Sequence, residues 1–353
     1  MVINRKPSVT IVVLNWNNFS DTAVCLESLG AVTYPNFNVV VVDNASTDDS
    51  TIRLRGLSFS YPFVLIENDS NLGYAAGNNV GIRYALEIGA SKILLLNNDT
   101  VVARDFLDRL CDCAERFPSA GIISARLFYL GDPTRVWFDG ARWSAEHIRL
   151  EWPGQGMLES ELPNEDHETD YASGAALLFR AEVAEKIGLL DEAFFLVWEE
   201  VDWCFRARAV GWTIVVATGA KVWHKIGASF GDESSPLRTY FSVRNEMLWF
   251  RRHASLDARS RLFVKNIRRL VPKFSLANGN EFLGKRLLWA VIDVVKSFAG
   301  QGSRLEYLAV RQAIFDYANG RLGDCPDKVR LWSQTWADGK KTRSRCEPGI
   351  KKK

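Results

Sequence analysis

The stretch KILLLNNDTVV, residues Lys92–Val102, decides the fold. Ile93–Leu96 is an unbroken apolar run, too short for an independent helix and long enough for a strand that is buried on both faces. The run stops abruptly at Asn97, Asn98 and Asp99. In an open α/β sheet, ligands bind beyond the carboxyl ends of the strands. The stretch therefore predicts a strand that delivers two amides and a carboxylate to a binding site, although Asn and Asp also favour plain turns.

Three apolar runs that precede this stretch also end on polar residues. Because helical segments separate them, we expect each run to be a buried strand of an α/β fold with a mostly parallel sheet and right-handed crossovers. The four strand ends would then crowd Asn and Asp along one edge of the sheet. The runs and the polar residues after them are Val9–Leu14 with Asn15 and Asn17, Val39–Val42 with Asp43 and Asn44, and Phe63–Ile66 with Asn68 and Asn71.

The net charge of the 353 residues is only +2, but it is divided unevenly along the chain. Residues 236–353 contain 25 Lys and Arg against 10 Asp and Glu, whereas residues 1–235 contain 19 against 32. Ser235 and Pro236 suit the N-cap and the first position of a helix. We therefore expect an α/β domain over residues 1–235, a basic helical region over 236–323 and a flexible basic tail over 324–353.

The sequence predicts neither a signal peptide nor a membrane-spanning helix. The apolar run near the N-terminus lacks a small-residue cleavage site, and Asp293 and Lys296 interrupt the longest other candidate, Leu287–Phe298. The six cysteines show no metal-binding spacing, which favours reduced thiols. We expect a cytoplasmic protein, with peripheral contact at the inner face of the membrane as a further option.

Glu199 and Glu200 are adjacent acids in an aromatic surround. Desolvation by apolar neighbours and repulsion between like charges both raise the pKa of a carboxyl group, which suits a general base. The alternative is a solvated helix start, where the helix dipole favours acids. In the same segment, Asp202 and Arg206 have the i,i+4 spacing of a helical ion pair.

Asp99 and His224 are candidate metal ligands. A strand-end carboxylate can hold Mg²⁺ or Mn²⁺, hard ions that take one or two carboxylates and complete their shell with diphosphate oxygens and water. His224 ends a predicted strand, although a lone histidine is more often structural. Asp43 has two readings: it can accept the imide N–H of a pyrimidine base, or it can form an Asx turn.

Seven short motifs follow one another between Val9 and Ser229. They are VLNWN (13–17), VVDNASTD (41–48), NLGYAAGNNVG (71–81), LLNND (95–99), SGAALL (173–178), WEEVDWCFRA (198–207) and WH (223–224). As a set they resemble the inverting glycosyltransferases of family 2, and most of all the rhamnosyltransferase-like branch. The resemblance implies a GT-A fold for residues 1–235, a nucleotide-diphospho-sugar donor and a divalent metal ion, Mg²⁺ or Mn²⁺.

The resemblance also implies a role for each candidate residue by its position. Glu200 falls at the place of the catalytic base, and Asp202 and Arg206 look like the pair that follows the base. Asp99 resembles the metal ligand, and His224 the histidine that completes the metal shell. The residues that resemble donor-binding positions are Asn17, Asp43, Asn44, Asn71, Gly73 and Asn97.

Two positions depart from the family pattern. Asn97 stands where an aspartate is expected, which leaves one formal charge at the metal site where two are common. Glu200 stands where the family has an aspartate as base, so the neighbouring Glu199 remains a candidate second acid. In the implied mechanism, the base deprotonates an acceptor hydroxyl that attacks the anomeric carbon from the face opposite the leaving group.

Two other classes of protein share parts of this pattern. A sugar-nucleotide nucleotidyltransferase would carry a glycine-rich and basic phosphate loop after its first strand, whereas this strand ends on Asn-Trp-Asn-Asn. The glycines at 73, 77 and 81 do not have the spacing of a dinucleotide fingerprint, and they can simply allow a helix to pack closely. A non-catalytic sugar- or nucleotide-binding module would have no need of Glu200. We therefore favour the transferase, with dTDP-rhamnose as the first candidate donor.

The basic helical region has two interpretations. Arg238, Arg244, Arg251 and Arg252 lie on one predicted helix among aromatic residues. The region can meet an anionic partner, such as a glycan acceptor linked to polyprenyl diphosphate or an anionic membrane surface. It can equally be a solvated face that packs on the sheet domain. Nucleic acid is not an expected partner, because no recognition motif accompanies the charge.

Overall fold

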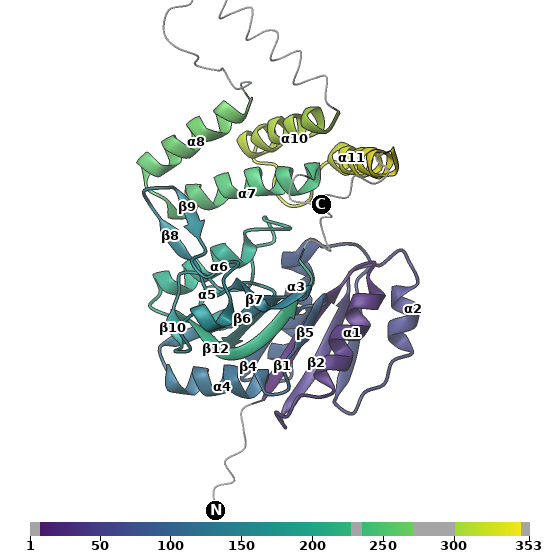
Figure 1. The fold of residues 1–353 in the computed structure, drawn as a ribbon, viewed down its shortest axis with the longest axis vertical. Helices are drawn as coiled ribbons and strands as arrows, with labels where there is room; N and C mark the ends of the chain where they lie inside the picture. The colour runs from purple at the N-terminus through teal and green to yellow at the C-terminus, as the bar shows by residue number, and fades with distance from the viewer. Residues whose placement is uncertain (1–7, 227–234, 271–300, 347–353) are drawn as a thin grey trace, which may run out of the picture. The chain divides into compact units, whose positions relative to one another are not determined.

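The computed structural model describes residues 8–226, 235–270 and 301–346 (Figure 1). The chain divides into two compact units, Met1–Ile226 and Gly227–Lys353. Within the described ranges, no helix is both long enough and apolar enough to cross a membrane. The apolar candidate Leu287–Phe298 and residues 347–353 of the predicted tail lie outside the described residues.

The first unit is built on one large sheet flanked by helices (Figure 1). The strand order is β10-β12-β6-β11-β4-β1-β2-β3, with β5 paired to β12 and β7 paired to β6. The predicted mostly parallel sheet is confirmed for the pairs β4–β1, β1–β2, β2–β3 and β6–β12. An antiparallel strand, β11, lies between the two parallel groups. The strands are β1 Val9–Asn15, β2 Phe37–Asp43, β3 Phe63–Glu67, β4 Lys92–Asn97, β5 Thr100–Val102, β6 Ala120–Tyr129, β7 Asp132–Phe138, β8 Arg142–Ser144, β9 Arg149–Glu151, β10 His167–Glu168, β11 Ala176–Arg180 and β12 Thr213–His224.

The helices of this unit lie between strands, as the alternating sequence pattern predicts. The helix after β1 begins at Phe19, and Asn18 is its N-cap residue. Gly188 follows the last helical residue of α5 with φ of 75°, a conformation that favours glycine. The helices are α1 Phe19–Leu29, α2 Ser50–Arg55, α3 Gly73–Glu87, α4 Phe106–Arg116, α5 Ala181–Ile187 and α6 Glu199–Ala209.

The carboxyl ends of β1 to β4 meet at one edge of the sheet. In the strand register, Asn15 lies opposite Asp43, and Leu14 lies opposite Asn97. Ile11–Val13 of β1, Val39–Val42 of β2 and Ile93–Leu96 of β4 are buried, because helices cover both faces of a parallel sheet. The prediction of a buried strand is wrong for Phe63–Ile66, which are only partly buried because β3 is an edge strand. The predicted polar edge is therefore present, formed by strands that are far apart in the sequence.

Two glycines of α3 allow this helix to approach β1 closely. A Cβ atom at Gly77 would lie 2.7 Å from Leu14 Cδ1, and one at Gly81 would lie 2.4 Å from Val12 Cγ1. Real Cβ atoms do not approach other atoms this closely, so any larger residue would push the helix away. Close helix–strand packing thus accounts for the spacing of these glycines.

We expect Gly81→Ala to destabilise the protein by about 1–3 kcal/mol, because the added methyl group overpacks the contact with Val12. Chemical denaturation of the full chain measures the change. Gly131→Ala is the matched control, since a Cβ at Gly131 would meet nothing within 4 Å. Equal stability of the two variants would contradict the close packing of α3.

The segment from Gly131 to Asp170 leaves the sheet and returns to it. Strand β7 folds back on β6, β8 and β9 form a separate hairpin, and β10 returns to the edge strand β12. A short 3-10 helix, η1 Glu159–Glu161, lies between the last two strands. We call this segment the insert.

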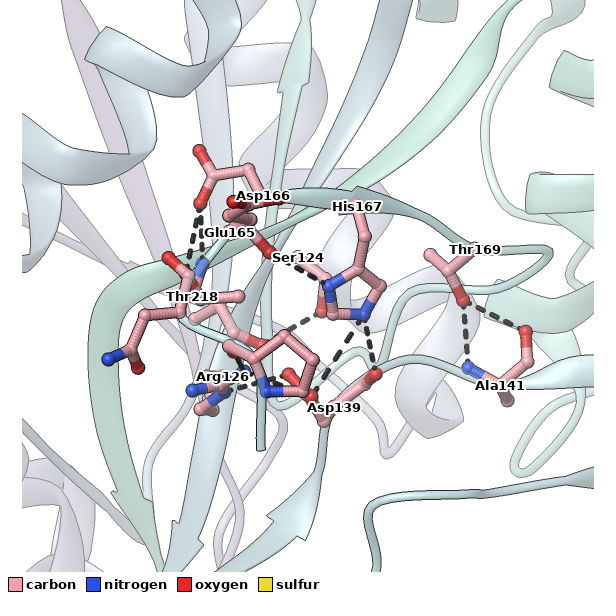
Figure 2. Close-up of polar contacts among 12 residues, drawn as sticks. Ser124, Arg126, Asp139, Ala141, Glu165, Asp166, His167, Thr169 and Thr218 are labelled. Carbon is pink, nitrogen blue, oxygen red and sulfur yellow. Dashed lines mark hydrogen bonds and ion pairs between the residues drawn. The ribbon is translucent and has the colours of Figure 1, made fainter. Parts of the chain in front are cut away.

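A buried ion pair ties the insert to the sheet (Figure 2). Arg126 on β6 donates to both carboxylate oxygens of Asp139, at 2.8 and 3.0 Å, and to the carbonyl of Pro163 at 2.6 Å. The side chains of Arg126 and Asp139 are 0% and 5% exposed. His167 Nε2 lies 3.1 Å from the carbonyl oxygen of Asp139, and Thr218 N donates to Asp166 Oδ1 at 2.9 Å. Because a buried charge that loses its partner is costly, this pair holds the insert in one position.

The second unit is helical in its described part. The helices are α7 Pro236–His253, α8 Leu256–Leu270, α10 Gln301–Ala318 and α11 Asp327–Cys346. Ser235 caps α7, since its Oγ accepts a hydrogen bond from Arg238 N, as the sequence predicts. Arg244 is fully buried on this helix, where its guanidinium donates to the carbonyl of Gly323 at 2.6 Å.

The prediction of a flexible tail over 324–353 is wrong for the part that forms α11. Val329 is fully buried and Cys325 is 6% exposed, so this segment packs although it is strongly charged. Arg330 also pairs with Asp324 at 2.5 Å, which joins the first turn of the helix to the residues before it. Burial of a few apolar side chains therefore outweighs the polar composition on which the prediction was based.

Candidate active site

Asp99 and His224 come together at the polar edge. Asp99 follows β4, and His224 is the last residue of β12, where it lies opposite Thr100 of β5. Asp99 Oδ1 is 3.0 Å from His224 Nε2, and both side chains are at most 10% exposed. Among the described residues, Asp99 Oδ1 and His224 Nδ1 have no hydrogen-bond partner. Asp99 Oδ1 and His224 Nε2 therefore form a close polar pair whose geometry is not that of a hydrogen bond.

This pair suits a hard divalent cation, since it offers one carboxylate and one imidazole. Within the described ranges, no third His, Cys, Asp or Glu joins the pair to make a group of three. A hollow of about 690 Å³ opens beside His224, which leaves room for a ligand that supplies further oxygens. Its lining includes Tyr129, Arg135, Gly156, His224 and Lys225.

The turn that carries Asp99 is held on two sides. Asn97 N donates to the carbonyl of Ala175 at 3.0 Å, and Asn98 Nδ2 donates to Thr22 Oγ1 at 2.8 Å. Thr100 Oγ1 donates to the carbonyl of Asn97 at 2.6 Å, which closes the turn. Asn and Asp thus form the plain turn that the sequence allowed, and the turn also presents the Asp99 carboxylate.

Glu199 and Glu200 lie in the first turn of α6. The residues before the helix are strained, because Phe195, Val197 and Trp198 have φ of 62°, 70° and 81° without being glycine. The carbonyl of Phe195 accepts a 2.7 Å hydrogen bond from Tyr74 N at the start of α3. This contact fixes the entry into α6 and thereby the position of both acids.

The surroundings of the two acids raise the pKa of each carboxyl group. Burial is the largest cause for both, and the charge of Glu200 raises the pKa of Glu199 further. Glu200 as a residue is partly exposed, but its Oε2 atom is buried and has no hydrogen-bond partner among the described residues. Tyr171 donates its hydroxyl to Glu200 Oε1 at 3.1 Å. One oxygen of Glu200 is therefore held by Tyr171, whereas the other is enclosed by the protein without a hydrogen-bond partner in the described part of the chain.

The acid pair and Asp99 share one neighbour, Tyr74. Burial raises the pKa of this hydroxyl, and the negative charges of Glu200, Glu199 and Asp99 raise it further. Tyr74 also donates to the carbonyl of Gly174 at 2.9 Å. A Cβ at Gly174 would lie 2.5 Å from that hydroxyl and 3.5 Å from Glu200 Oε1. The structure thus brings the predicted base and the predicted metal ligand to the same region of the unit.

Asp43 closes the turn after β2 with its side chain, but its bond from Ser46 N spans three residues, one more than in the Asx turn that the sequence allowed. Its carboxylate accepts hydrogen bonds from Asn15 Nδ2, from the backbone and hydroxyl of Ser46, and from Thr51 Oγ1, at 2.7–3.0 Å. Four donors occupy a group with about four acceptor positions. Asn17 is exposed nearby with φ of 52°, and its Oδ1 accepts from Thr47 N.

Asn44 connects β2 to the start of α3. Its Nδ2 donates to Asn71 Oδ1 and to the carbonyl of Gly73, at 2.9 and 3.1 Å. Its Oδ1 accepts from Asn68 Nδ2 and Leu72 N, both at 3.0 Å. This buried amide uses all four of its hydrogen-bonding positions within the protein, so it organises the loop before α3.

Asp202 and Arg206 form the predicted i,i+4 ion pair, at 2.8 Å. Arg206 also donates to the carbonyls of Ile187 and Leu189, at 2.6 and 2.7 Å. The pair therefore holds α6 against the loop that follows α5. The ion pair thereby supports Glu199 and Glu200 indirectly, through α6, the helix that carries both acids.

Aromatic residues that the sequence did not single out connect the two ends of the candidate site. The ring of Trp137 lies 4.8 Å from that of His224, and Trp152 lies 5.7 Å from Trp137. Tyr171, the partner of Glu200, packs 6.5 Å from Trp152 and 5.4 Å from Phe138. We call Trp137, Phe138, Trp152 and Tyr171 the aromatic wall. In the sequence, only the abundance of Trp in the insert indicates the aromatic wall.

Comparisons with known proteins find one family and several relatives of this chain. A family model described as Glycosyl transferase family 2 matches residues 10–188, about half of the chain. A low-salt glycan biosynthesis hexosyltransferase of Haloferax volcanii is 27% identical over 74% of this chain and 78% of its own length. A dTDP-rhamnosyl transferase of Shigella flexneri is 26% identical over 76% and 89%. An N-acetylglucosaminyl-diphospho-decaprenol L-rhamnosyltransferase of Mycobacterium tuberculosis is 27% identical over 68% and 88%.

The fold also resembles solved structures. A mannosyltransferase from Pyrobaculum calidifontis, solved in complex with GDP-Man and Mn²⁺, superposes with a TM-score of 0.51 at 15% identity, over 95% of this chain and 85% of that one. Residues 1–349 of TarS from Staphylococcus aureus, in complex with UDP-GlcNAc, superpose with a TM-score of 0.50 at 14% identity, over 89% and 92%. The predicted GT-A fold is confirmed.

Proposed function

The chain belongs to glycosyl transferase family 2, and from this premise we propose that it transfers rhamnose from dTDP-rhamnose to a hydroxyl of a glycan acceptor. The rhamnosyltransferases among its relatives support this donor. The decaprenol-linked substrate in the name of one relative supports an acceptor linked to polyprenyl diphosphate. The observation that carries the proposal is the Glu200 carboxylate, which has one oxygen held by Tyr171 and one buried oxygen without a hydrogen-bond partner among the described residues.

Glu200 acts as the general base in this proposal. Its free oxygen takes the proton of the acceptor hydroxyl while that oxygen forms a bond to the anomeric carbon. The bond from the anomeric carbon to the diphosphate breaks on the opposite face, so the configuration inverts and a nucleoside diphosphate leaves. Glu199 remains the candidate second acid, because it is buried beside Glu200 and its Oε2 has no hydrogen-bond partner among the residues that the structure describes.

Asp99 and His224 would hold Mg²⁺ or Mn²⁺. The unpartnered Asp99 Oδ1 and the nearby imidazole fit such an ion in position and chemistry. When bound, the ion neutralises the charge that develops on the departing diphosphate. Asn97 adds no charge to the site, so the diphosphate of the donor has to supply much of the ion's coordination.

The other polar residues of the edge would shape the donor site. Asp43 and Asn44 order the loops after β2 and before α3, which include Asn71 and Gly73. Asn17 is exposed at the end of β1 and is therefore accessible to the nucleotide. In this proposal, base recognition by Asp43 requires one of its internal hydrogen bonds to give way to the base.

The basic helical unit would meet an anionic partner, such as the diphosphate of the acceptor or an anionic membrane surface at the inner face. Its sequence contains an excess of 15 positive charges over residues 236–353. On α8, the exposed fractions of Leu256 and Phe263 are 77% and 59%, and Arg261 is exposed beside them. Exposed apolar residues mixed with basic ones are typical of helices that lie on anionic lipid.

A thermal-shift panel of nucleotide sugars with Mn²⁺, followed by product analysis, tests the proposed function. We expect dTDP-rhamnose to raise the melting temperature more than the other donors, because ligands that bind only the folded state stabilise it. Incubation with an acceptor should release a nucleoside diphosphate. Release of pyrophosphate would indicate a nucleotidyltransferase instead, and stabilisation without any product would indicate a binding module.

A further inference from the structure

The aromatic wall contains two kinds of ring. Phe138 is fully buried and Tyr171 is 5% exposed, so these two fill the interior of the insert. Trp137 and Trp152 are only partly buried, although tryptophan has the largest side chain of the apolar residues. Their rings meet at 83°, so the two indoles form a corner rather than a face-to-face stack. Large, partly exposed aromatic side chains of this kind are common in ligand sites.

The corner lies along the path that connects the proposed metal ligands to the proposed base. Trp137 contacts the His224 ring, and Trp152 contacts Tyr171, whose hydroxyl binds Glu200. In an inverting transfer, the acceptor has to reach the base with one hydroxyl while the donor diphosphate lies at the metal ligands. An acceptor ring in this position would therefore contact the indoles.

We propose that Trp137 and Trp152 form the acceptor subsite, where the apolar C–H face of a hexopyranoside ring packs against an indole. This inference rests on the proposed function, because it takes Glu200 as the base that the acceptor hydroxyl approaches. Hexopyranoside rings present C–H groups on a face and hydroxyl groups around the rim. With the face on an indole, the rim hydroxyls would lie on the side of Tyr171, whose own hydroxyl binds Glu200.

The rest of the insert holds the corner in place. Phe138 packs against Trp152 at 5.5 Å and 87°, and Asp139, the next residue, pairs with the buried Arg126. The ion pair in Figure 2 thus anchors the strand end that supports both indoles. A preformed aromatic surface loses little freedom on binding, which favours a weakly polar ligand such as a sugar face.

Binding of simple glycosides to the full chain tests the inference without any need for catalysis. The probes are the methyl glycosides of glucose, galactose, mannose and N-acetylglucosamine, observed by saturation-transfer NMR. We expect at least one of them to receive saturation, strongest at the C–H protons of a single ring face. The signal should fall about tenfold in Trp137→Ala and in Trp152→Ala, and Trp→Phe at each position should restore part of it.

Trp212→Ala is the matched control, because it also removes a partly buried indole from the same unit. Trp212 precedes β12, at the end of the strand opposite to His224, and packs near Gly121. The saturation-transfer signal of the Trp212→Ala variant should equal that of the wild type. Circular dichroism verifies that every variant is folded. Wild-type protein that binds none of the glycosides, or Trp variants that bind them equally well, would overturn the inference.

Kinetic measurements then distinguish a failure of the acceptor-subsite inference from a failure of the proposed function. The Trp137 and Trp152 variants should raise the KM for the best glycoside about tenfold, while the dissociation constant of the donor stays within about twofold. A loss of donor affinity in these variants would assign the corner to the donor and overturn the inference. If the wild type transfers sugar to no acceptor, the proposed function fails, and the NMR result still decides whether the corner binds hexopyranosides.

Discussion

The Glu200→Gln variant is expected to bind the donor as the wild type does and to lose sugar transfer by about 10²–10⁴-fold. Glutamine has the same size and its amide oxygen can keep the hydrogen bond from Tyr171, which the wild type makes at 3.1 Å. It cannot take a proton from the acceptor hydroxyl. Calorimetric titration with the donor and the rate of nucleoside diphosphate release measure the two effects separately.

Glu199→Gln is the matched control, because Glu199 is the adjacent acid and is also buried. We expect its loss of activity to be much smaller than that of Glu200→Gln. A larger loss would identify Glu199 as the base. Near-normal turnover in Glu200→Gln would refute the assignment of Glu200 as the base.

The pH dependence of transfer follows from the same group. Burial raises the pKa of Glu200, and the base works only when it has lost its proton. The rate should therefore fall as the pH is lowered through this raised pKa, at a higher pH than for an exposed glutamate. The profile of kcat/KM reports it, and the residual rate of Glu200→Gln should lack this acid limb.

Removal of divalent metal by EDTA is expected to abolish transfer, and Mn²⁺ or Mg²⁺ should restore it. Stabilisation of charge on the leaving diphosphate is worth several kcal/mol, which corresponds to a loss of at least about 10²-fold. Asp99→Asn should produce a loss of similar size, because it removes the one carboxylate of the candidate pair. Full activity in EDTA would contradict the proposed role of Asp99.

Two further variants sharpen this test. Asn97→Asp adds a second negative charge beside Asp99, so we expect half-maximal activity at a lower metal concentration. Asp105→Asn is the control for the loss of a carboxylate, because Asp105 is half exposed and pairs with Arg109 on the surface. Its metal requirement should equal that of the wild type.

The order of the elements in the first unit could be predicted from the sequence because the signals are local. Apolar runs such as Ile93–Leu96 mark buried strands, and the polar residues after them mark the strand ends. The antiparallel strand β11 was not predicted, since the direction of a strand depends on the connection that leads to it. The tail prediction failed at α11 for a related reason, because composition does not reveal that Val329 is buried.

The candidate site was predictable in part. Motif residues such as Glu200, Asp99 and His224 have a recognisable order in the chain, and the structure places two of them 3.0 Å apart. Tyr171 and the indoles of Trp137 and Trp152 were not predicted. Their significance depends on which rings they contact, and these contacts join residues that are far apart in the chain.

The sequence by itself determined the family, the parallel strands and the polar residues at their ends, because each of these is written in short runs of neighbouring residues. Only the tertiary structure decided which polar groups are already used within the protein and which are not. Asp43 and Asn44 are occupied by internal hydrogen bonds, whereas Asp99 and Glu200 each keep a buried oxygen that has no such partner in the described part of the chain. Hydrogen bonding and desolvation depend on neighbours in space, and folding alone sets those neighbours.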